Sequence, residues 1–110
     1  MIQIIVGTDR PKSNSAKIAN IVQELLSAEG ADCEVLNLRD VPLQELDGSQ
    51  YSENQPEKLT EIKNKLNNAT GFFMVVPEYN GSYPGALKYF IDHWKFPSTF
   101  EYRPVAFVGI

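Results

Sequence analysis

Apolar residues form two patterns along the chain, and each pattern predicts one type of element. Nearly unbroken apolar runs at 2–6, 71–76 and 104–110 are typical of strands buried on both faces of a parallel sheet. Residues 33–38 alternate less cleanly between apolar and polar and predict a further strand. Such strands need a covering layer on each face of the sheet.

The segments between these strands predict three helices. Apolar residues recur at helical spacing over 18–26, and Ser13 or Ser15 can cap this first helix. Further helices are expected after Pro56 and after the Pro-Gly pair at 84–85. The alternation β-α-β-α-β-α-β predicts an α/β fold with a parallel sheet and right-handed crossovers.

The segment 39–55 has no sustained period, and a loop of this length is usually functional or mobile. The net charge of −4 is concentrated around it, because nine acids and one base lie between Glu24 and Glu57. We interpret this stretch as a solvated face, and the acidity argues against a nucleic-acid partner. With 110 residues, 43% of them apolar, the chain is expected to form one globular domain.

The numbers of cysteine and histidine residues limit which disulfides and metal sites the chain can form. A single cysteine, Cys33, excludes an internal disulfide or a multi-cysteine zinc site, and a single histidine, His93, excludes a His-rich metal site. We interpret Cys33 as a core residue and His93 as a helix-end residue. No apolar run approaches the roughly 20 residues of a membrane span. No basic region precedes the first strand, so we expect no signal peptide and a cytoplasmic protein.

The loop after the first strand is the first candidate for chemistry. It contains Thr8, Arg10, Ser13 and Ser15 and opens the first helix. Hydroxyl donors, a guanidinium and a helix N-terminus make a suitable phosphate cradle at the carboxyl end of a strand. Neither the Walker nor the dinucleotide glycine pattern is present. A polar loop with an ordinary cap explains these residues equally well.

The loop 77–85 after the third apolar run is the second candidate. Its prolines, glycines and the Asn-Gly pair at 80–81 suggest a defined path with exposed N–H groups. Such groups can bond the polar edge of a planar heterocycle, and Tyr79 and Tyr83 can pack against its face. The alternative is a tight turn with solvent-exposed tyrosines.

Together the two loops resemble a known family. The pairing of GTDRPKSNSAKIA with PEYNGSYPGALKYFIDHW is similar to the NADPH-dependent FMN reductases, which include quinone, chromate and azo-dye reductases. The resemblance runs from Ile4 to Ile110 and implies a flavodoxin-like three-layer α/β/α fold with strand order 2-1-3-4. It also implies a single FMN-binding domain over residues 1–110, with NADPH or NADH as co-substrate.

The resemblance also assigns roles to individual residues. The first loop would bind the FMN phosphate and the second would lie along the isoalloxazine ring. The cofactor-binding residues expected on this basis are Thr8, Arg10, Ser13, Ser15, Pro77, Glu78, Tyr79, Asn80 and Gly81. No catalytic side chain and no metal ligand is assigned, because the cofactor carries the hydride chemistry. The electron acceptor would be a quinone, an azo compound, a metal oxyanion or free flavin.

Members of this family are longer than this chain and continue with a fifth strand, helices and a loop that contributes to the flavin site. We therefore expect a C-terminally short form whose fourth strand is an apolar sheet edge. Such an edge favours a homo-oligomer. The alternative to an oxidoreductase is a non-catalytic flavodoxin-like domain that binds flavin weakly or acts through a protein partner.

Overall fold

A parallel sheet of four strands organises the molecule. The computed structural model describes residues 1–110, and its strands lie in the order β2-β1-β3-β4. Their bounds are Ile2–Val6 (β1), Cys33–Asn37 (β2), Gly71–Val76 (β3) and Val105–Gly109 (β4). The last residue of β1, Val6, lies opposite both Asn37 and Val75. The carboxyl ends of the central strands therefore meet at one edge of the sheet.

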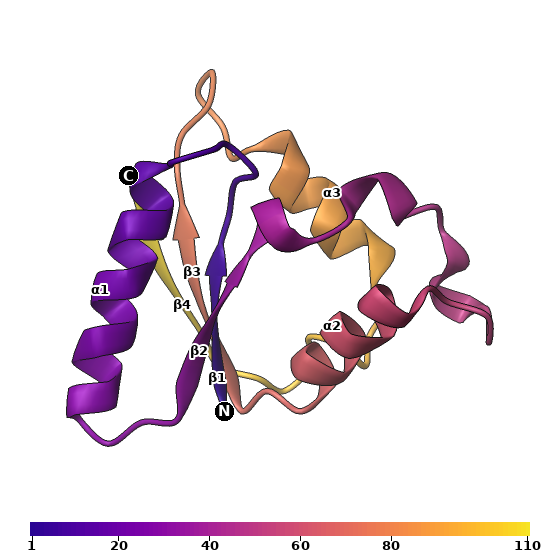
Figure 1. Ribbon diagram of the computed structural model, residues 1–110, viewed down its shortest axis with the longest axis horizontal. Coiled ribbons are helices and arrows are strands. Elements are labelled where there is room, and N and C mark those ends of the chain that lie inside the picture. The colour runs from indigo at the N-terminus through magenta and orange to yellow at the C-terminus, as the bar shows by residue number, and fades with distance from the viewer.

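Helices cover both faces of this sheet. The helix α1 (Asn14–Ala28) lies on one face, and α2 (Glu57–Asn67) and α3 (Gly85–His93) lie on the other (Figure 1). The element order and the strand order confirm the flavodoxin-like α/β/α fold that the sequence predicts. None of the helices is long and apolar enough to cross a membrane.

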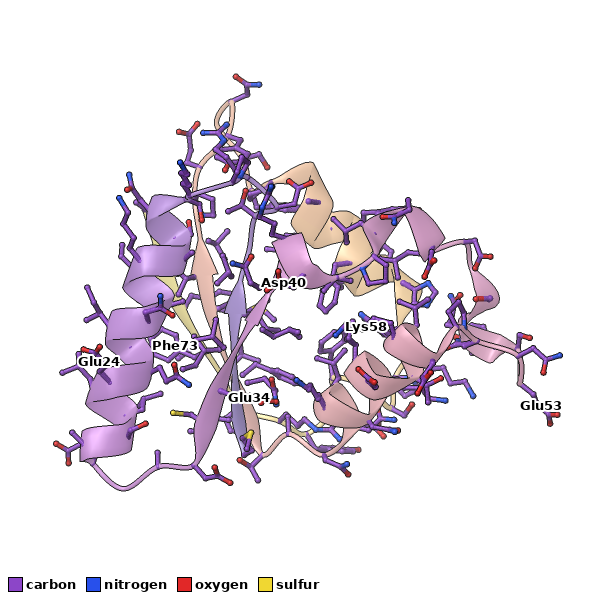
Figure 2. The ribbon with its side chains drawn as sticks, in the orientation of Figure 1. Glu24, Glu34, Asp40, Glu53, Lys58 and Phe73 are labelled. Carbon is purple, nitrogen blue, oxygen red and sulfur yellow. The ribbon has the colours of Figure 1, made fainter.

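The core is divided between the two faces of the sheet. The larger cluster packs β1 and β3 against α2 and α3, and includes Ile5, Leu59 and Phe90, all without solvent exposure. The smaller cluster lies under α1, toward which Phe73 points (Figure 2). β1 and β3 are thus buried on both faces, as their unbroken apolar runs predict.

The segment after β2 is more ordered than a plain acidic loop. It contains three short 3-10 turns at Leu38–Asp40, Leu43–Glu45 and Ser49–Tyr51. Val41 and Leu46 from this segment are buried in the larger cluster, and Leu43 packs against it. All of its charged positions are exposed, such as Glu53, which projects outward at the far end of the segment (Figure 2). The interpretation as a solvated face is therefore correct for the acids and wrong for the apolar anchors.

Two apolar surfaces are exposed. On β4, Val105 and Phe107 are 42% and 68% exposed, as expected for an apolar strand at a sheet edge. On α1, Ile21 and Leu25 are 54% and 63% exposed, although they belong to the predicted apolar stripe. In α1 only Ser15 and Ala19 are buried, and Ile18, Val22 and Leu26 are half-buried.

A single arginine fastens the segment between α3 and β4. The guanidinium of Arg103 donates to the backbone carbonyls of Ala69 at 3.0 Å and Thr99 at 2.7 Å. It also donates to the carbonyls of Ser98 at 2.9 Å and Asn67 at 2.6 Å. These bonds hold residues 98–103 against the end of α2 and the start of β3.

Candidate functional site

The loops after β1 and β3 meet at the carboxyl edge of the sheet and enclose a hollow. The two loops project beyond the strand ends beside the N-terminus of α1 (Figure 1). The hollow has a volume of about 280 Å³. It is lined by Arg10, Lys12, Ser13, Asn14, Ser15, Pro77, Glu78, Tyr79 and Ile110. Open α/β sheets place their ligand sites at this edge.

The side of the hollow formed by the first loop is suited to an anion. Ser13 caps α1 in an extended conformation, and its Oγ accepts a hydrogen bond from the Ala16 N–H at 3.0 Å. Ser15, in the first turn, is buried at the helix start. Arg10 and Lys12 add two positive charges beside the positive end of the helix dipole. The combination favours a phosphate-like group.

The opposite side of the hollow is a tight hairpin turn. Tyr79 and Ser82 exchange backbone hydrogen bonds at 2.7 and 3.2 Å around Asn80 and Gly81. Both central residues have positive φ, 53° and 82°, as a type I′ turn requires. The Glu78 carboxylate accepts a hydrogen bond from the Gly81 N–H, which braces the turn from inside. The Asn-Gly pair in the sequence is therefore explained by the backbone conformation.

β4 extends its pairing into the site. The Ile110 N–H donates to the Val76 carbonyl at 3.1 Å, and the Glu78 N–H donates to the Ile110 carbonyl at 3.2 Å. This continues the β3–β4 ladder past the ends of the two strands. The base of the second loop is thereby fixed to the sheet, and Ile110 forms part of the wall of the hollow.

Side chains also join the two loops directly. The hydroxyl of Tyr79 lies 2.6 Å from Thr8 Oγ1. Thr8 Oγ1 also accepts a hydrogen bond from the Arg10 N–H at 3.2 Å. The guanidinium carbon of Arg10 lies 4.2 Å from the centroid of the Tyr79 ring, a cation–π contact. Arg39, from the 3-10 turn after β2, donates a 3.3 Å hydrogen bond to the Asp9 carbonyl and so links that turn to the first loop.

The structure distributes the expected site residues over three places. Thr8 is not among the residues that line the hollow, and its hydroxyl is hydrogen-bonded to that of Tyr79. Asn80 and Gly81 form the tip of the turn. The other six line the hollow: Arg10, Ser13, Ser15, Pro77, Glu78 and Tyr79. Sequence reasoning missed Lys12, Asn14 and Ile110. The charge of Lys12 within the same loop was an available signal, whereas the position of Ile110 depends on strand pairing.

The double substitution Asn80→Ala/Gly81→Ala should damage the second loop. Each alanine would have to adopt a left-handed φ, which costs of the order of 1 kcal/mol per residue. We expect the turn to rearrange, the affinity for the flavin that the resemblance implies to fall, and the melting temperature to fall by several degrees. Flavin titration and thermal melting of the two proteins measure both effects. Unchanged affinity would show that the path of this turn does not matter for binding.

Away from the hollow, His93 is the last residue of α3, as the sequence predicts, and its side chain is buried. It is 4% exposed, and its ring meets the Trp94 ring edge to face at a centroid distance of 4.8 Å. Neither ring nitrogen has a hydrogen-bond partner within the chain. Burial lowers the pKa of His93 below its usual value, and the negative charge of Asp47 opposes this effect only in part.

This burial predicts a pH dependence of stability. The unfolded chain takes up a proton near the ordinary histidine pKa, about 6.5, before the folded chain does. The free energy of unfolding should therefore fall as the pH drops through and below that value, and His93 should contribute no such dependence above it. His93→Phe keeps a ring beside Trp94 and removes the titration. Urea midpoints measured between pH 5 and 8 should decline less steeply toward acid for the variant; parallel curves would contradict the prediction.

No group of three or more histidine, cysteine, aspartate or glutamate side chains converges as metal ligands would. A 2-1-3-4 parallel sheet, with a loop of cations and hydroxyls after β1 facing a braced turn after β3, defines a flavodoxin-like protein. Sequence comparison assigns the protein to one family within this class. The chain belongs to the NADPH-dependent FMN reductase family, whose model matches residues 1–110.

Individual relatives agree with this placement. The chain is 30% identical over 109 residues to an FMN-dependent NADPH-azoreductase of Staphylococcus saprophyticus, covering 96% of this chain and 57% of the relative. An azoreductase of the same description from Staphylococcus aureus is 28% identical with the same coverage. The chain thus spans a little over half the length of these curated relatives.

Two solved structures illustrate the similarity of fold. The flavoenzyme NAD(P)H:(acceptor) oxidoreductase FerB of Paracoccus denitrificans matches with a TM-score of 0.76 and 25% identity, over 98% of this chain and 59% of that one. An oxidoreductase from Corynebacterium diphtheriae matches with a TM-score of 0.77. At 22% identity over 98% of this chain and 62% of that one, the second likeness supports the fold alone.

Proposed function

We propose that residues 1–110 form one FMN-binding domain of an NAD(P)H-dependent oxidoreductase. The reaction would pass a hydride from NADPH or NADH through FMN to a small-molecule acceptor, such as a quinone, an azo compound, a metal oxyanion or free flavin. The hollow at the carboxyl edge of the sheet is the observation that carries this proposal, because it joins cations, hydroxyls and a helix N-terminus. The names of the relatives support it.

The donors around the hollow fit the phosphate of FMN. Arg10 and Lys12 supply charge against a dianion, and the guanidinium can donate two parallel hydrogen bonds. The Ser13 hydroxyl oxygen already accepts from Ala16, so its hydrogen can be donated to a phosphate oxygen. Ser15 adds a second hydroxyl at the buried helix start. This donor set would hold a phosphate monoester without a metal ligand.

The turn after β3 would face the isoalloxazine ring, mainly with backbone groups. FMN, when bound, supplies the two-electron hydride chemistry, and the chain binds it, orients it and excludes water. The Glu78 carboxylate holds the Gly81 N–H and so shapes the turn; we assign it no proton-transfer role. The fixed path of residues 78–81 would present N–H and carbonyl groups to the polar edge of the ring.

Titration of the chain with FMN and with riboflavin tests the proposal. We expect quenching of FMN fluorescence at a defined stoichiometry and much weaker binding of riboflavin, which lacks the phosphate. NADPH or NADH oxidation with a quinone or an azo dye as acceptor then tests the reaction. A protein that binds neither flavin would contradict the proposal. One that binds FMN but does not oxidise either nicotinamide would support the alternative, a non-catalytic flavin-binding domain.

We also propose that the polypeptide 1–110 associates with copies of itself through the apolar surface at β4. Val105 and Phe107 border a hollow of about 470 Å³, lined mainly by apolar side chains of β3, α3 and residue 100. Pairing along β4 would satisfy its free backbone edge and cover these side chains. Light scattering after gel filtration tests this, and a stable 12.4 kDa monomer at high concentration would contradict it. The cytoplasmic location and the absence of a nucleic-acid partner stay predictions.

A further inference from the structure

Tyr79 lies between the two loops of the site and contacts both. Its hydroxyl pairs with Thr8, which has no solvent exposure, and the Arg10 guanidinium lies over its ring. Its backbone is held in the hairpin turn by both hydrogen bonds to Ser82. The ring therefore has a fixed position, and one of its faces is covered by the arginine. The expectation that Tyr79 packs against a planar ligand stays a prediction and concerns its other face.

The fixed Tyr79 ring restricts the conformations of the Arg10 side chain. Arg10 is exposed, and its long side chain has many rotamers, so a free guanidinium would lose much entropy on binding an anion. The face of an aromatic ring attracts a guanidinium, at an exposed site by an amount worth about two- to fivefold in an equilibrium constant. With the ring anchored on buried Thr8, this attraction holds the cation at the wall of the hollow before any ligand arrives.

We infer that Tyr79 is a positioning residue that selects a phosphate-bearing flavin over an unphosphorylated one by holding Arg10 in place. The inference rests on the proposed FMN-binding function and deepens it. Tyr79 belongs to the loop that we assign to the isoalloxazine ring, but it acts on the FMN phosphate, through Arg10. A phosphate bound to Arg10 would, through the same contacts, also steady the second loop, because Tyr79 is the first residue of its turn.

The experiment measures the ratio of riboflavin to FMN dissociation constants in a set of variants. Tyr79→Leu removes both the ring and the hydroxyl, and we expect this ratio to fall about three- to tenfold. Tyr79→Phe keeps the ring, and we expect it to lower this ratio about twofold. Thr8→Val removes the hydroxyl partner and should lower the ratio by a similar factor. Tyr102→Leu, at a residue that is 97% exposed, is the matched control and should leave the ratio unchanged.

A double-variant cycle separates positioning from simple structural damage. Once Arg10 has been replaced by alanine, adding Tyr79→Leu should have no further effect on the ratio, because the two residues act through one contact. In NMR spectra, the Arg10 side-chain protons of the unliganded chain should be shifted upfield by the ring current, and this shift should vanish in Tyr79→Leu and persist in Tyr79→Phe.

The outcomes distinguish failure of the inference from failure of the proposed function. Equal losses of FMN and riboflavin affinity in Tyr79→Leu, or additive effects with Arg10→Ala, would overturn the positioning role while leaving FMN binding intact. A wild-type chain that binds neither flavin would overturn both. If Tyr79→Leu does not fold, Tyr79→Phe and Thr8→Val still test the inference, because both keep nearly the native shape. An unchanged ratio of riboflavin to FMN dissociation constants in both variants would also overturn the inference.

Discussion

Replacing Arg10 by alanine should weaken FMN binding by about 10- to 100-fold, since a hydrogen bond from a charged donor contributes about 1.5–3 kcal/mol. The guanidinium lies at the wall of the hollow, beside the capped start of α1. Riboflavin lacks the group that Arg10 would bind, so its affinity should stay close to that of the wild type. Fluorescence titration of both flavins measures the two effects on the same preparations.

The matched control is Arg39→Ala. Arg39 is also an exposed arginine near the first loop, but it contacts only the Asp9 carbonyl and does not line the hollow. We expect it to change FMN affinity by less than about threefold. Raising the salt concentration should reduce the difference between wild type and Arg10→Ala, because screening weakens exposed charges. Equal FMN affinities for wild type and Arg10→Ala would place the phosphate elsewhere.

Arg103→Met should destabilise the chain by about 2–4 kcal/mol, the largest loss of stability that we expect from an exchange outside the apolar core. The substitution removes hydrogen bonds to four backbone carbonyls at 2.6 to 3.0 Å. Two of these carbonyls belong to Ala69 and Thr99, which are buried, so they would be left without the donor. Methionine keeps an unbranched side chain of similar length, which limits the packing contribution.

Urea denaturation followed by circular dichroism gives the change in unfolding free energy. Lys58→Met removes a charge of the same sign from an exposed ion pair with Glu61 at 3.6 Å, and we expect a change within about 0.5 kcal/mol. Arg103→Lys should lie between the two, because an ammonium cannot reach four carbonyls spread over both segments. Coincident curves for wild type and Arg103→Met would show that residues 98–103 are held by other contacts.

The sequence predicts the fold where local and tertiary preferences agree. The runs at 2–6 and 71–76 are buried on both faces, so their pattern reflects their final environment. The Asn-Gly pair at 80–81 predicts a turn because few other residues accept positive φ. Ser13 caps α1 for an equally local reason. These features need no knowledge of distant residues.

The remaining features depend on contacts between distant residues. Ile21 and Leu25 follow the helical period of α1, yet they are exposed, and the neighbouring stripe of the helix packs against the smaller cluster. The buried anchors Val41 and Leu46 have no periodic spacing, because they lie in an irregular segment with a short 3-10 turn between them. Nothing in the sequence links Arg10 to Tyr79: the sequence predicts that each contacts a ligand, whereas in the structure they contact each other.

The parallel arrangement of the sheet also determines when the site can exist during folding. β1 pairs with β3 in the register Val6 to Val75, and the Thr8–Tyr79 contact spans 71 residues. Pairings of this sequence separation form late and slowly, since the intervening chain must first lose its freedom. The loop after β1 is synthesised first and becomes half of a binding site only when residues 77–82 are in place. A ligand held between these loops should therefore slow unfolding without accelerating folding.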